Sequence, residues 1–586
     1  MPSTEPLPGT ALLRQGQSEL QFSALARVVI AMRADEVIPV LQTIEAAVNA
    51  QGQYAVGFIS YEAAAAYGLA VHPPLADLPL LWFGLYDRMA TVAGRTTDTT
   101  QPPPAPPYSV GTWQAAVDEA AYAAAVARIR NYLAEGDTYQ VNYTFPLQAF
   151  FAGDARALFN ELAAGQPTDH AAFIDTGRFA ICSVSPELFF ALDGEQLIAK
   201  PMKGTAARGR TLAEDEAHSN GLRQSKKNRA ENVMIVDMLR NDLGRIAQTG
   251  SVAVPRLFDI ERYPTLLQMT STVTARTQAS VVNILASLFP CASITGAPKV
   301  RTMQIIHELE KHPRGIYSGA IGFIGPQRQA RFNVAIRTVL IDRERQQARY
   351  GVGGGLVWDS TAGDEYAECL LKARVLTQRR PAFQLLESLL WEPDGGYFLL
   401  PAHLQRLADS AVYFNVPLDR FAIEAALSER ALTLQTVSKI RLLGNQDGTF
   451  AVEAQPLIHP APPLPLRVGL ARTPVDSNTI WLYHKTTQRE LYQAARASRP
   501  DCDEVILWNE RGELTEASLA NLILDLDGEW VTPPVSSGLL AGTYRGWLLA
   551  IGQIRERILT AADLRAARGI ALINSVRRWQ TALLVH

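Results

Sequence analysis

The sequence predicts an α/β protein of two units, a large first unit with extensive antiparallel sheet and a smaller α/β unit after it. Three observations lead to this prediction. The chain has 586 residues, which is more than one hydrophobic core usually serves. Helical and strand patterns alternate along it, and turns marked by Gly or Pro join the strands. The segment Thr377–Pro381 follows a helical pattern and ends in a proline that stops a helix.

Within the first unit, the apolar spacing predicts helices and strands in a definite order. Strands are expected over 320–324, 332–341 and 349–358, and helices over 115–134, 224–243 and 364–375. The proline-rich stretch Gln101–Pro107 is interpreted as a stiff connector within this unit. We expect domains over residues 1–375 and 383–586, with a linker over 376–382.

The composition narrows the class of protein. Hydrophobic residues make up 47% and charged residues 19%, which is typical of a folded globular enzyme. The net charge of −3 gives no basic field for nucleic acid. The four cysteines are far apart, so neither a disulfide framework nor a zinc site is indicated. No signal peptide is apparent, and Glu62 interrupts the Ala-rich stretch 54–71, so we expect a cytoplasmic protein without a membrane span.

Carboxylates on two predicted helices form a candidate metal site. Glu231 lies near the start of the apolar helix Arg229–Asp242, and Glu365 and Glu368 share one face of the segment Gly363–Lys372. Such a pair of helices could hold Mg²⁺, which takes one or two carboxylates plus waters and an anionic substrate group. The alternative is two solvated helix faces with surface ion pairs.

Two further segments suggest anion binding. Ser293–Lys299 runs directly into an amphipathic helix, whose free amides could bind a carboxylate or phosphate, although an ordinary helix start remains an alternative. Gly351–Gly355 lacks the GxGxxG spacing of a dinucleotide site and is not followed by a helix. Its glycines would instead let a ligand approach a strand closely.

Together these segments resemble the chorismate-utilising family of anthranilate, aminodeoxychorismate and isochorismate synthases. The resemblance covers roughly residues 20–375, and its segments occur in the family's order. They are Gly136–Asn142, Ser185–Phe189, Lys200–Thr205, Arg229–Asp242, Ser293–Lys299, Phe332–Thr338, Gly351–Ser360 and Asp364–Lys372.

The resemblance implies a role for each matching residue. It implies that Glu187 is the general acid that protonates the departing hydroxyl. It implies an Mg²⁺ site in which Glu365 is a nearby supporting carboxylate. The implied Mg²⁺ ligands are Glu231 and Glu368, and the implied chorismate-binding residues are Thr295, Gly296, Arg337, Tyr350, Gly353, Gly354 and Lys372.

Lys203 distinguishes between the reactions of this family. The segment Pro201–Thr205 resembles that of aminodeoxychorismate synthases, whereas anthranilate synthases have alanine in place of this lysine. The resemblance implies that Lys203 attacks ring C2 and is later displaced when ammonia adds at C4. A surface lysine is the alternative.

Two positions depart from the family pattern. Gln268 stands where the family often has histidine, and glutamine cannot titrate near neutral pH. Cys291 stands where glycine is usual, and we interpret it as a packed thiol. The stretch Gly57–Glu62 resembles part of an amino-acid pocket in the family, but we interpret it as a core strand.

The second unit contains few lysines that could carry pyridoxal phosphate. Between Pro381 and His586 only Lys439 and Lys485 occur. Lys439 alternates with apolar residues, as on a half-exposed strand, and Lys485 precedes a helical pattern that begins at Glu490. If this unit uses pyridoxal phosphate, Lys485 is the better candidate.

The surroundings of Lys485 resemble the fold-type IV pyridoxal-phosphate family of aminotransferases and aminodeoxychorismate lyase. The segments that carry this resemblance, within about Phe383–Arg577, are His403–Leu407, Leu514–Asn521 and Gly538–Arg545. It implies that Arg406 binds the phosphate and that Glu516 partners the pyridine nitrogen. It further implies phosphate contacts from Gly542 and Thr543 and a substrate or phosphate contact from Asn574 and Ser575. The alternatives are a surface charge for Arg406 and a helix cap for Glu516.

Both resemblances together imply a bifunctional enzyme of folate biosynthesis. It would convert chorismate to aminodeoxychorismate and then release 4-aminobenzoate and pyruvate. No glutaminase segment is apparent, so we expect ammonia from a separate amidotransferase subunit. The fold-type IV resemblance implies a homodimer. The alternatives are an anthranilate synthase fused to a branched-chain or D-amino-acid aminotransferase, and a fusion whose second half is inactive and regulatory.

Overall fold

The computed structural model describes residues 9–16, 18–93, 107–377, 381–457 and 465–585. Part of the proline-rich stretch (101–106) and part of the expected linker (378–380) lie outside the described residues. Two compact units emerge: residues 1–207 with 219–380, and residues 208–218 with 381–586. No described helix combines the length and the apolar character that a bilayer crossing requires.

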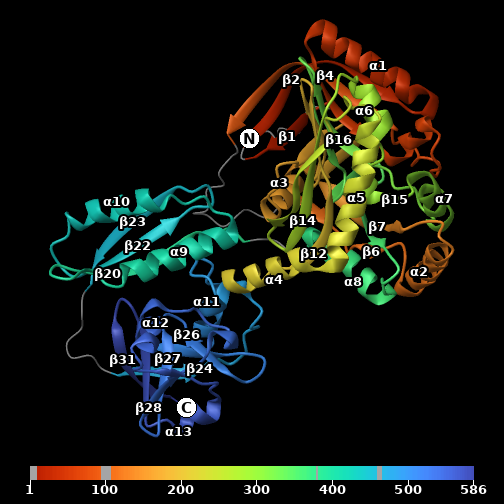
Figure 1. The fold of residues 1–586 in the computed structure, drawn as a ribbon. Helices are drawn as coiled ribbons and strands as arrows, with labels where there is room; N and C mark the ends of the chain where they lie inside the picture. The colour runs from red at the N-terminus through yellow and green to blue at the C-terminus, as the bar shows by residue number, and fades with distance from the viewer. Residues whose placement is uncertain (1–8, 17, 94–106, 378–380, 458–464, 586) are drawn as a thin grey trace. The chain divides into compact units, whose positions relative to one another are not determined.

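The first unit is built on a 19-stranded sheet, and its described strand pairs are antiparallel (Figure 1). This confirms the expected extensive antiparallel sheet. The strands are β1 (Ala11–Gln15), β2 (Ser18–Ala31), β3 (Tyr54–Ile59), β4 (Leu81–Ala93), β5 (Tyr108–Val110), β6 (Gln114–Ala115), β7 (Gln140–Gly153), β8 (Ala172–Asp175), β9 (Phe179–Ser183), β10 (Leu188–Asp193), β11 (Gln196–Lys200), β12 (Met202–Ala207), β13 (Ala253–Arg262), β14 (Leu266–Arg276), β15 (Gly296–Ala297), β16 (Ala320–Gly325), β17 (Gln329–Val334), β18 (Thr338–Asp342) and β19 (Gln347–Leu356).

Helices cover this sheet and enclose two large apolar cores. The helices are α1 (Ala34–Gln51), α2 (Glu119–Ala134), α3 (Ala155–Gly165), α5 (Lys226–Gly244), α6 (Val281–Leu288), α7 (Lys299–Leu309) and α8 (Ala362–Ala373), and α4 (Leu212–Gln224) spans both units. One core packs α1, α5 and α6 against strands β10, β16 and β17. The other packs α2, α3 and α8 against β7 and β19. The predicted helices over 115–134, 224–243 and 364–375 are confirmed, with ends shifted by a few residues.

The helices that carry the candidate site begin at side-chain caps. The Ser225 hydroxyl accepts a hydrogen bond from Asn228 N at the start of α5, and the Thr361 hydroxyl accepts one from Asp364 N at the start of α8. These caps satisfy amides that the first helical turn leaves unpaired, and they fix where Glu231 and Glu365 enter their helices.

The prediction of one strand over 332–341 is wrong. β17 ends at Val334 and pairs with β10 and β16, whereas β18 begins at Thr338 and pairs with β9 and β19. Arg337, in the break, has a φ of +48°. The chain changes pairing partners here, which an alternating apolar pattern cannot reveal, because both strands are buried.

The second unit contains two sheets, as the expected two-subdomain α/β unit requires. β20 (Leu385–Glu392), β21 (Gly396–Tyr397), β22 (Ser438–Gly444) and β23 (Phe450–Pro456) form an antiparallel sheet that α9 (Leu400–Phe414) and α10 (Arg420–Ala431) contact. Lys439 lies half-buried on β22, as predicted.

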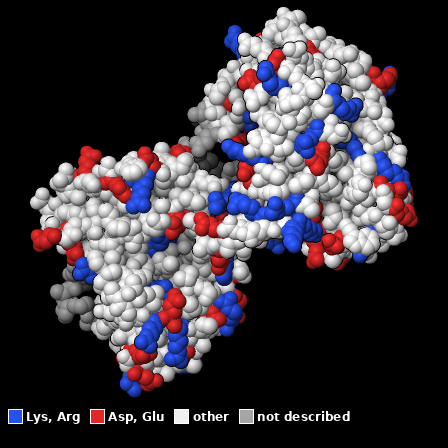
Figure 2. Space-filling model, viewed as in Figure 1, with Lys and Arg blue, Asp and Glu red and all other residues white. Residues whose placement is uncertain are grey.

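The other sheet has eight strands and mixes parallel with antiparallel pairs. Its strands are β24 (Leu466–Leu470), β25 (Glu504–Trp508), β26 (Leu514–Ala517), β27 (Asn521–Leu526), β28 (Glu529–Thr532), β29 (Arg555–Glu556), β30 (Gly569–Asn574) and β31 (Arg578–Leu584), and the helices of this part are α11 (Glu490–Ala497), α12 (Thr543–Ala550) and α13 (Ala561–Ala566). On the face drawn in Figure 2, basic and acidic side chains are interspersed over each unit, in line with the net charge of −3.

Candidate active sites

Lys203 lies in a bulge of β12. The register between β12 and β14 shifts between Met202 and Thr205, so the residues between them leave the regular ladder. Burial lowers the pKa of Lys203, although the nearby carboxylate of Glu231 favours the charged form. None of the described residues forms a hydrogen bond or an ion pair with the Lys203 amine, and Glu231 acts on it only through its charge. A buried amine of lowered pKa is a nucleophile that is readily deprotonated.

Glu187, immediately before β10, is suited to donate a proton. Its side chain is buried, and its Oε1 atom has no hydrogen-bond partner among the described residues. Burial raises the pKa of Glu187 to about 7, against the opposing effects of Ser293 and Lys203. A substantial fraction of Glu187 is therefore protonated near neutral pH, as a general acid requires.

Gly355 brings Gln140 and Lys203 together, and sequence reasoning missed Gln140. A Cβ atom at Gly355 would lie 2.6 Å from Lys203 Nζ and 2.8 Å from Gln140 Nε2. Gln140 is completely buried, and neither its Nε2 nor its Oε1 has a partner among the described residues. Unpaired buried amides are costly, so a ligand group is expected beside Gln140. The available signal was a glutamine at the start of an otherwise largely apolar strand.

Three carboxylates come from α5 and α8, as predicted. Burial raises the pKa of Glu231 and of Glu365. Repulsion from the Glu368 carboxylate raises the pKa of both groups further. The Lys372 ammonium, 2.8 Å from Glu368 Oε1, lowers the pKa of Glu368. Among the described residues no group of three or more His, Cys, Asp or Glu is arranged around a common point for a metal. The all-oxygen donors nevertheless fit Mg²⁺, which needs few protein carboxylates and completes its shell with water and substrate.

The predicted carboxylate-binding group gathers around β19. Lys372 Nζ donates to Gly353 O over 3.0 Å, and the Tyr350 hydroxyl donates to Lys372 O over 3.2 Å. A Cβ atom at Gly354 would lie 3.1 Å from Glu365 Oε2, so this strand and α8 are in close contact. Arg337 is buried, and no described residue pairs with its guanidinium. A buried, unpaired guanidinium is well suited to receive a substrate carboxylate.

Gly296 lies against the backbone of Gln140, and Thr295 bonds to Cys291 and Asn142. Gly296 pairs with Val141, and its φ of +147° suits glycine. A Cβ atom at this position would lie 2.0 Å from Gln140 O. Thr295 uses its hydroxyl to donate to Cys291 O over 3.1 Å. Cys291 is buried, as expected for a packed thiol, and burial raises its pKa to about 12.

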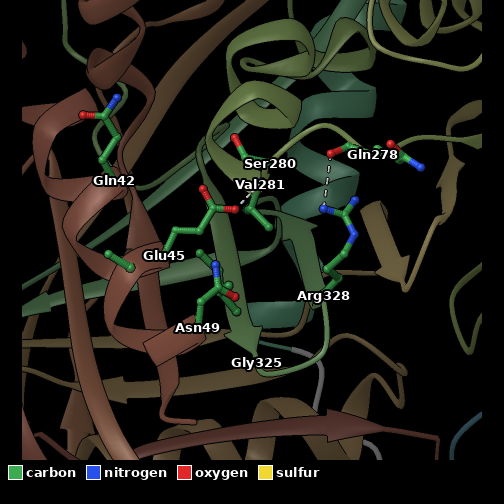
Figure 3. Close-up of a pocket in the computed structure, with 10 residues that line it drawn as sticks. Gln42, Glu45, Asn49, Gln278, Ser280, Val281, Gly325 and Arg328 are labelled. Carbon is green, nitrogen blue, oxygen red and sulfur yellow. Dashed lines mark hydrogen bonds between the residues drawn. The ribbon is translucent and has the colours of Figure 1, made fainter. Parts of the chain in front are cut away.

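The pocket in Figure 3 lies apart from these residues. It is bordered by α1, the start of α6 and the β16–β17 turn, and Glu45 there accepts a hydrogen bond from Val281 N over 2.7 Å. Arg328 donates to the carbonyls of Gln278 and Ala279. Glu45 and Arg328 thus bond to the backbone around the pocket, and no predicted site residue lines it.

In the second unit, Lys485 is the centre of a cluster of charged residues. Leu386 N of β20 donates to Lys485 O over 2.9 Å, which anchors its backbone. Burial lowers the pKa of Lys485 to about 8, and the nearby Arg406 adds to this effect, while Glu387 and Glu516 oppose it. The predicted lysine and the predicted charged partners therefore lie within electrostatic range of one another.

Glu516 lies on β26, so the alternative of a helix cap is wrong. Its Oε1 accepts hydrogen bonds from the Tyr492 hydroxyl over 2.8 Å and from Leu540 N over 3.2 Å. Burial raises the pKa of Glu516 to about 7. A positively charged ring nitrogen beside it would favour the carboxylate form.

Arg406 is bound to a buried carboxylate that sequence reasoning missed. Its Nε and Nη2 donate to the two oxygens of Glu387, each over 2.8 Å, and Nη1 donates to Ala541 O over 3.1 Å. His403 Nδ1 lies 2.7 Å from Glu387 Oε2. Burial opposes the charge of Glu387, but Arg406 and His403 hold its pKa at about 2. Glu387 was detectable as an acid among the apolar residues of β20, and the alternative of a solvated Arg406 is wrong.

The predicted phosphate turn adjoins Arg406. Gly542 precedes α12, and a Cβ atom there would lie 1.9 Å from Asn521 Oδ1. Thr543 Oγ1 lies 3.2 Å from His403 Nε2. Asn574 and Ser575 are less available, because Asn574 Oδ1 accepts from Arg577 N over 2.8 Å and Ser575 Oγ donates to Ser388 O over 3.4 Å.

Comparison with known proteins matches each unit to a family. Residues 12–378 match the family described as chorismate binding enzyme, and residues 384–583 match the family described as amino-transferase class IV. The chain is 39% identical over 269 residues to aminodeoxychorismate synthase component 1 of Bacillus subtilis, covering 46% of this chain and 57% of that protein. It is 38% identical over 270 residues to an anthranilate synthase component 1 of Haloarcula marismortui, covering 46% of this chain and 53% of that protein.

A solved structure shows the same fold for the first unit. Anthranilate synthase component I from Streptococcus pneumoniae superposes with a TM-score of 0.51 at 23% identity, covering 64% of this chain and 94% of that one. The match spans about half the length of each of the two curated relatives, from Bacillus subtilis and Haloarcula marismortui.

Proposed function

Because the chain belongs to the chorismate binding enzyme family through residues 12–378, we propose that its first unit converts chorismate and ammonia to 4-amino-4-deoxychorismate. The observation that carries this proposal is the unpaired amine of Lys203 in the β12 bulge, beside the protonatable Glu187. A relative named aminodeoxychorismate synthase component 1 supports it.

The residues of the first unit account for both steps of the proposed reaction, the loss of the C4 hydroxyl and the addition of ammonia at C4. The neutral amine of Lys203 forms a bond to ring C2, and the C4 hydroxyl leaves as water with the proton of Glu187. Ammonia then forms a bond to C4, and the bond between C2 and the amine of Lys203 breaks. Arg337 would pair with a substrate carboxylate. Glu231, Glu365 and Glu368 would hold Mg²⁺, which would neutralise another carboxylate.

We propose that the second unit releases pyruvate from 4-amino-4-deoxychorismate and yields 4-aminobenzoate for folate. Arg406, Gly542 and Thr543 would bind the phosphate of pyridoxal phosphate, and Glu516 would face its ring nitrogen. The cofactor, when bound, supplies an electron sink. Lys485 would hold it covalently and afterwards carry the proton that moves between substrate atoms, since its pKa of about 8 permits both protonation states.

The same proposal includes the source of ammonia, the cellular location and the oligomeric state. A relative is named component 1, which supports a separate amidotransferase subunit as the donor of ammonia. A cytoplasmic location accords with the four free cysteines and with the proposed chemistry, which needs no membrane or nucleic acid. A homodimer stays a prediction that rests on the fold-type IV resemblance alone.

One incubation tests the proposal. The purified chain is supplied with chorismate, Mg²⁺, ammonium and pyridoxal phosphate, and the products are separated by chromatography. We expect 4-aminobenzoate and pyruvate in equal amounts. Accumulation of 4-amino-4-deoxychorismate would refute the role of the second unit, and anthranilate would refute the role of Lys203 and favour the anthranilate synthase alternative.

A further inference from the structure

Residues 208–215 form a compact hook within the second unit, although they lie inside the sequence range of the chorismate binding family match. Arg208 Nε lies 2.6 Å from Asp215 Oδ1, which also accepts a hydrogen bond from Gly209 N over 3.0 Å. A Cβ atom at Gly209 would lie 2.2 Å from Asp215 N. The side chain of Asp215 is completely buried, so the hook is a preformed element.

The hook is attached to α9 through Tyr413. The Tyr413 hydroxyl donates to Gly209 O over 2.7 Å, and Arg208 Nη2 donates to Tyr413 O over 2.8 Å. The Arg208 guanidinium also lies 4.2 Å from the centre of the Tyr413 ring. Tyr413 is only 2% exposed, so these contacts are shielded from water.

The hook also holds the two residues that precede Lys485. His484 Nε2 lies 3.1 Å from Arg210 O, and because a carbonyl only accepts, Nε2 carries the proton. His484 Nδ1 can then accept from the Ser410 hydroxyl at 3.0 Å. Arg210 Nη1 donates to the Tyr483 hydroxyl over 3.1 Å. Tyr483 and His484 are both buried, and these bonds orient their polar atoms together with the bond of the Tyr483 hydroxyl to Ser477 O over 2.6 Å.

We propose that the hook is a positioning element for Lys485. The side chain of Lys485 has no described hydrogen bond of its own, and its backbone is fixed by Leu386 on one side and by the hook-bound Tyr483 and His484 on the other. This inference rests on the proposed role of Lys485 as the lysine that carries pyridoxal phosphate. A segment of the chorismate-binding sequence would thus be required for the second activity.

The test measures how pH governs attachment of pyridoxal phosphate to the full-length chain. The variants are Tyr413→Phe, which removes one hydroxyl and keeps the ring, and Arg210→Ala. Arg420→Ala, in an exposed ion pair with Glu424, is the matched control. After a short exposure to pyridoxal phosphate, borohydride reduction fixes the cofactor, and peptide mass spectrometry quantifies the modified Lys485.

In the wild type, attachment should rise as pH passes about 8, because burial lowers the pKa of Lys485 to that value and only the neutral amine reacts. A loosened hook admits water, so the midpoint in both variants should move upward by up to about one pH unit, and attachment at pH 7.5 should fall up to about 10-fold. The control should match the wild type.

Two results would overturn the inference in distinguishable ways. If both variants keep the wild-type midpoint and rate, the hook does not position Lys485, while the proposed function stands. If the wild type itself takes up no cofactor at Lys485, the proposed function of the second unit fails, and this inference fails with it.

Discussion

At the scale of single residues, both candidate sites depend on groups whose charge is set by burial. Lys203 and Lys485 are amines of lowered pKa, and Glu187 is a carboxyl of raised pKa. Burial disfavours the charged form in each case. These are the protonation states that nucleophilic attack, covalent attachment of a carbonyl cofactor and proton donation require.

Replacement of Lys203 by methionine should abolish the first reaction and leave the second intact. The variant Lys203→Met keeps most of the volume but removes the nucleophile, so formation of 4-amino-4-deoxychorismate should fall by about 10³-fold or more, equivalent to at least ~4 kcal/mol. The control is Lys200→Met, which alters the same segment but removes a lysine paired with Glu261. Lys203→Met activity close to that of the control would contradict the role of Lys203.

The pH dependence of the first reaction should report Glu187. Because the acid form donates the proton and the pKa of Glu187 is about 7, kcat/KM for chorismate should decline as pH rises through 7. In Glu187→Gln the rate at pH 6 should fall by about 10²- to 10⁴-fold, and the declining limb should disappear. Glu195→Gln, in an exposed ion pair with Arg276, serves as the control. If kcat/KM of the Glu187 variant still declined above pH 7, that decline would have to come from the titration of another group.

The residues that sequence reasoning found and missed differ in a physical way. Lys203, Glu187 and Glu516 became candidates because a resemblance supplied them, and Lys485 because only one other lysine lies between Pro381 and His586. Gln140 and Glu387 were missed, because a polar residue in a buried strand gives the same local pattern whether it faces a ligand, a partner or the solvent. Only the three-dimensional neighbours distinguish an unpaired amide from a carboxylate held by an arginine.

At the scale of elements, strands position more of the two sites than helices do. Lys203 depends on a bulge in β12, Arg337 on the break between β17 and β18, and the close approach to Lys203 on Gly355 at the end of β19. Amphipathic helices were predictable from their period, as α2, α5 and α8 show. Bulges and changes of strand partner could not be predicted from the sequence, because they arise from pairing between segments far apart in the sequence.

The contact between β20 and α9 should stabilise the second unit in a pH-dependent manner. The pKa of Glu387 is about 2 in the folded state, below its ordinary value, so its ion pair stabilises the fold above the unfolded pKa. That stability, about 3 kcal/mol for a shift of this size, should be lost as pH falls from ~4 through 2.

Urea unfolding of the full chain checks this expectation. At pH 7 the variant Glu387→Gln should lower the free energy of unfolding of the second unit by about 3 kcal/mol. This difference from the wild type should become smaller as pH falls from ~4 towards 2. Glu424→Gln, which alters an exposed pair on α10, should change little. If the variant were less stable than the wild type by the same amount at pH 7 and at pH 2.5, the loss of stability would come from altered packing and not from the lost charge of Glu387.

At the scale of the whole molecule, each compact unit holds the residues of one proposed reaction. The described residues of the first site all lie within 1–207 and 219–380, and those of the second within 381–586. The fold class and the presence of two catalytic units could be predicted from the sequence, since length, periodicity and the order of segments are global properties. The membership of residues 208–218 in the second unit could not, because it depends on tertiary contacts alone.

Two defective variants should complement each other. Lys203→Met and Lys485→Ala should each fail to make 4-aminobenzoate from chorismate, ammonium and both cofactors. An equimolar mixture should make it after a lag, because the intermediate released by one chain can diffuse to the other. The measurement is the time course of 4-aminobenzoate by chromatography. A mixture that stays inactive, although each variant performs its remaining reaction separately, would show that the intermediate is not released.

The hook has a consequence for how the chain folds during synthesis. Arg210 and His484 are 274 residues apart, so residue 210 leaves the ribosome long before the histidine that it binds has been made. Closing so long a loop costs entropy and slows folding. The nascent chain must therefore keep the segment around Asp215 accessible while the rest is translated. Maturation of the second unit is expected to wait until His484 has been translated, however early the first unit folds.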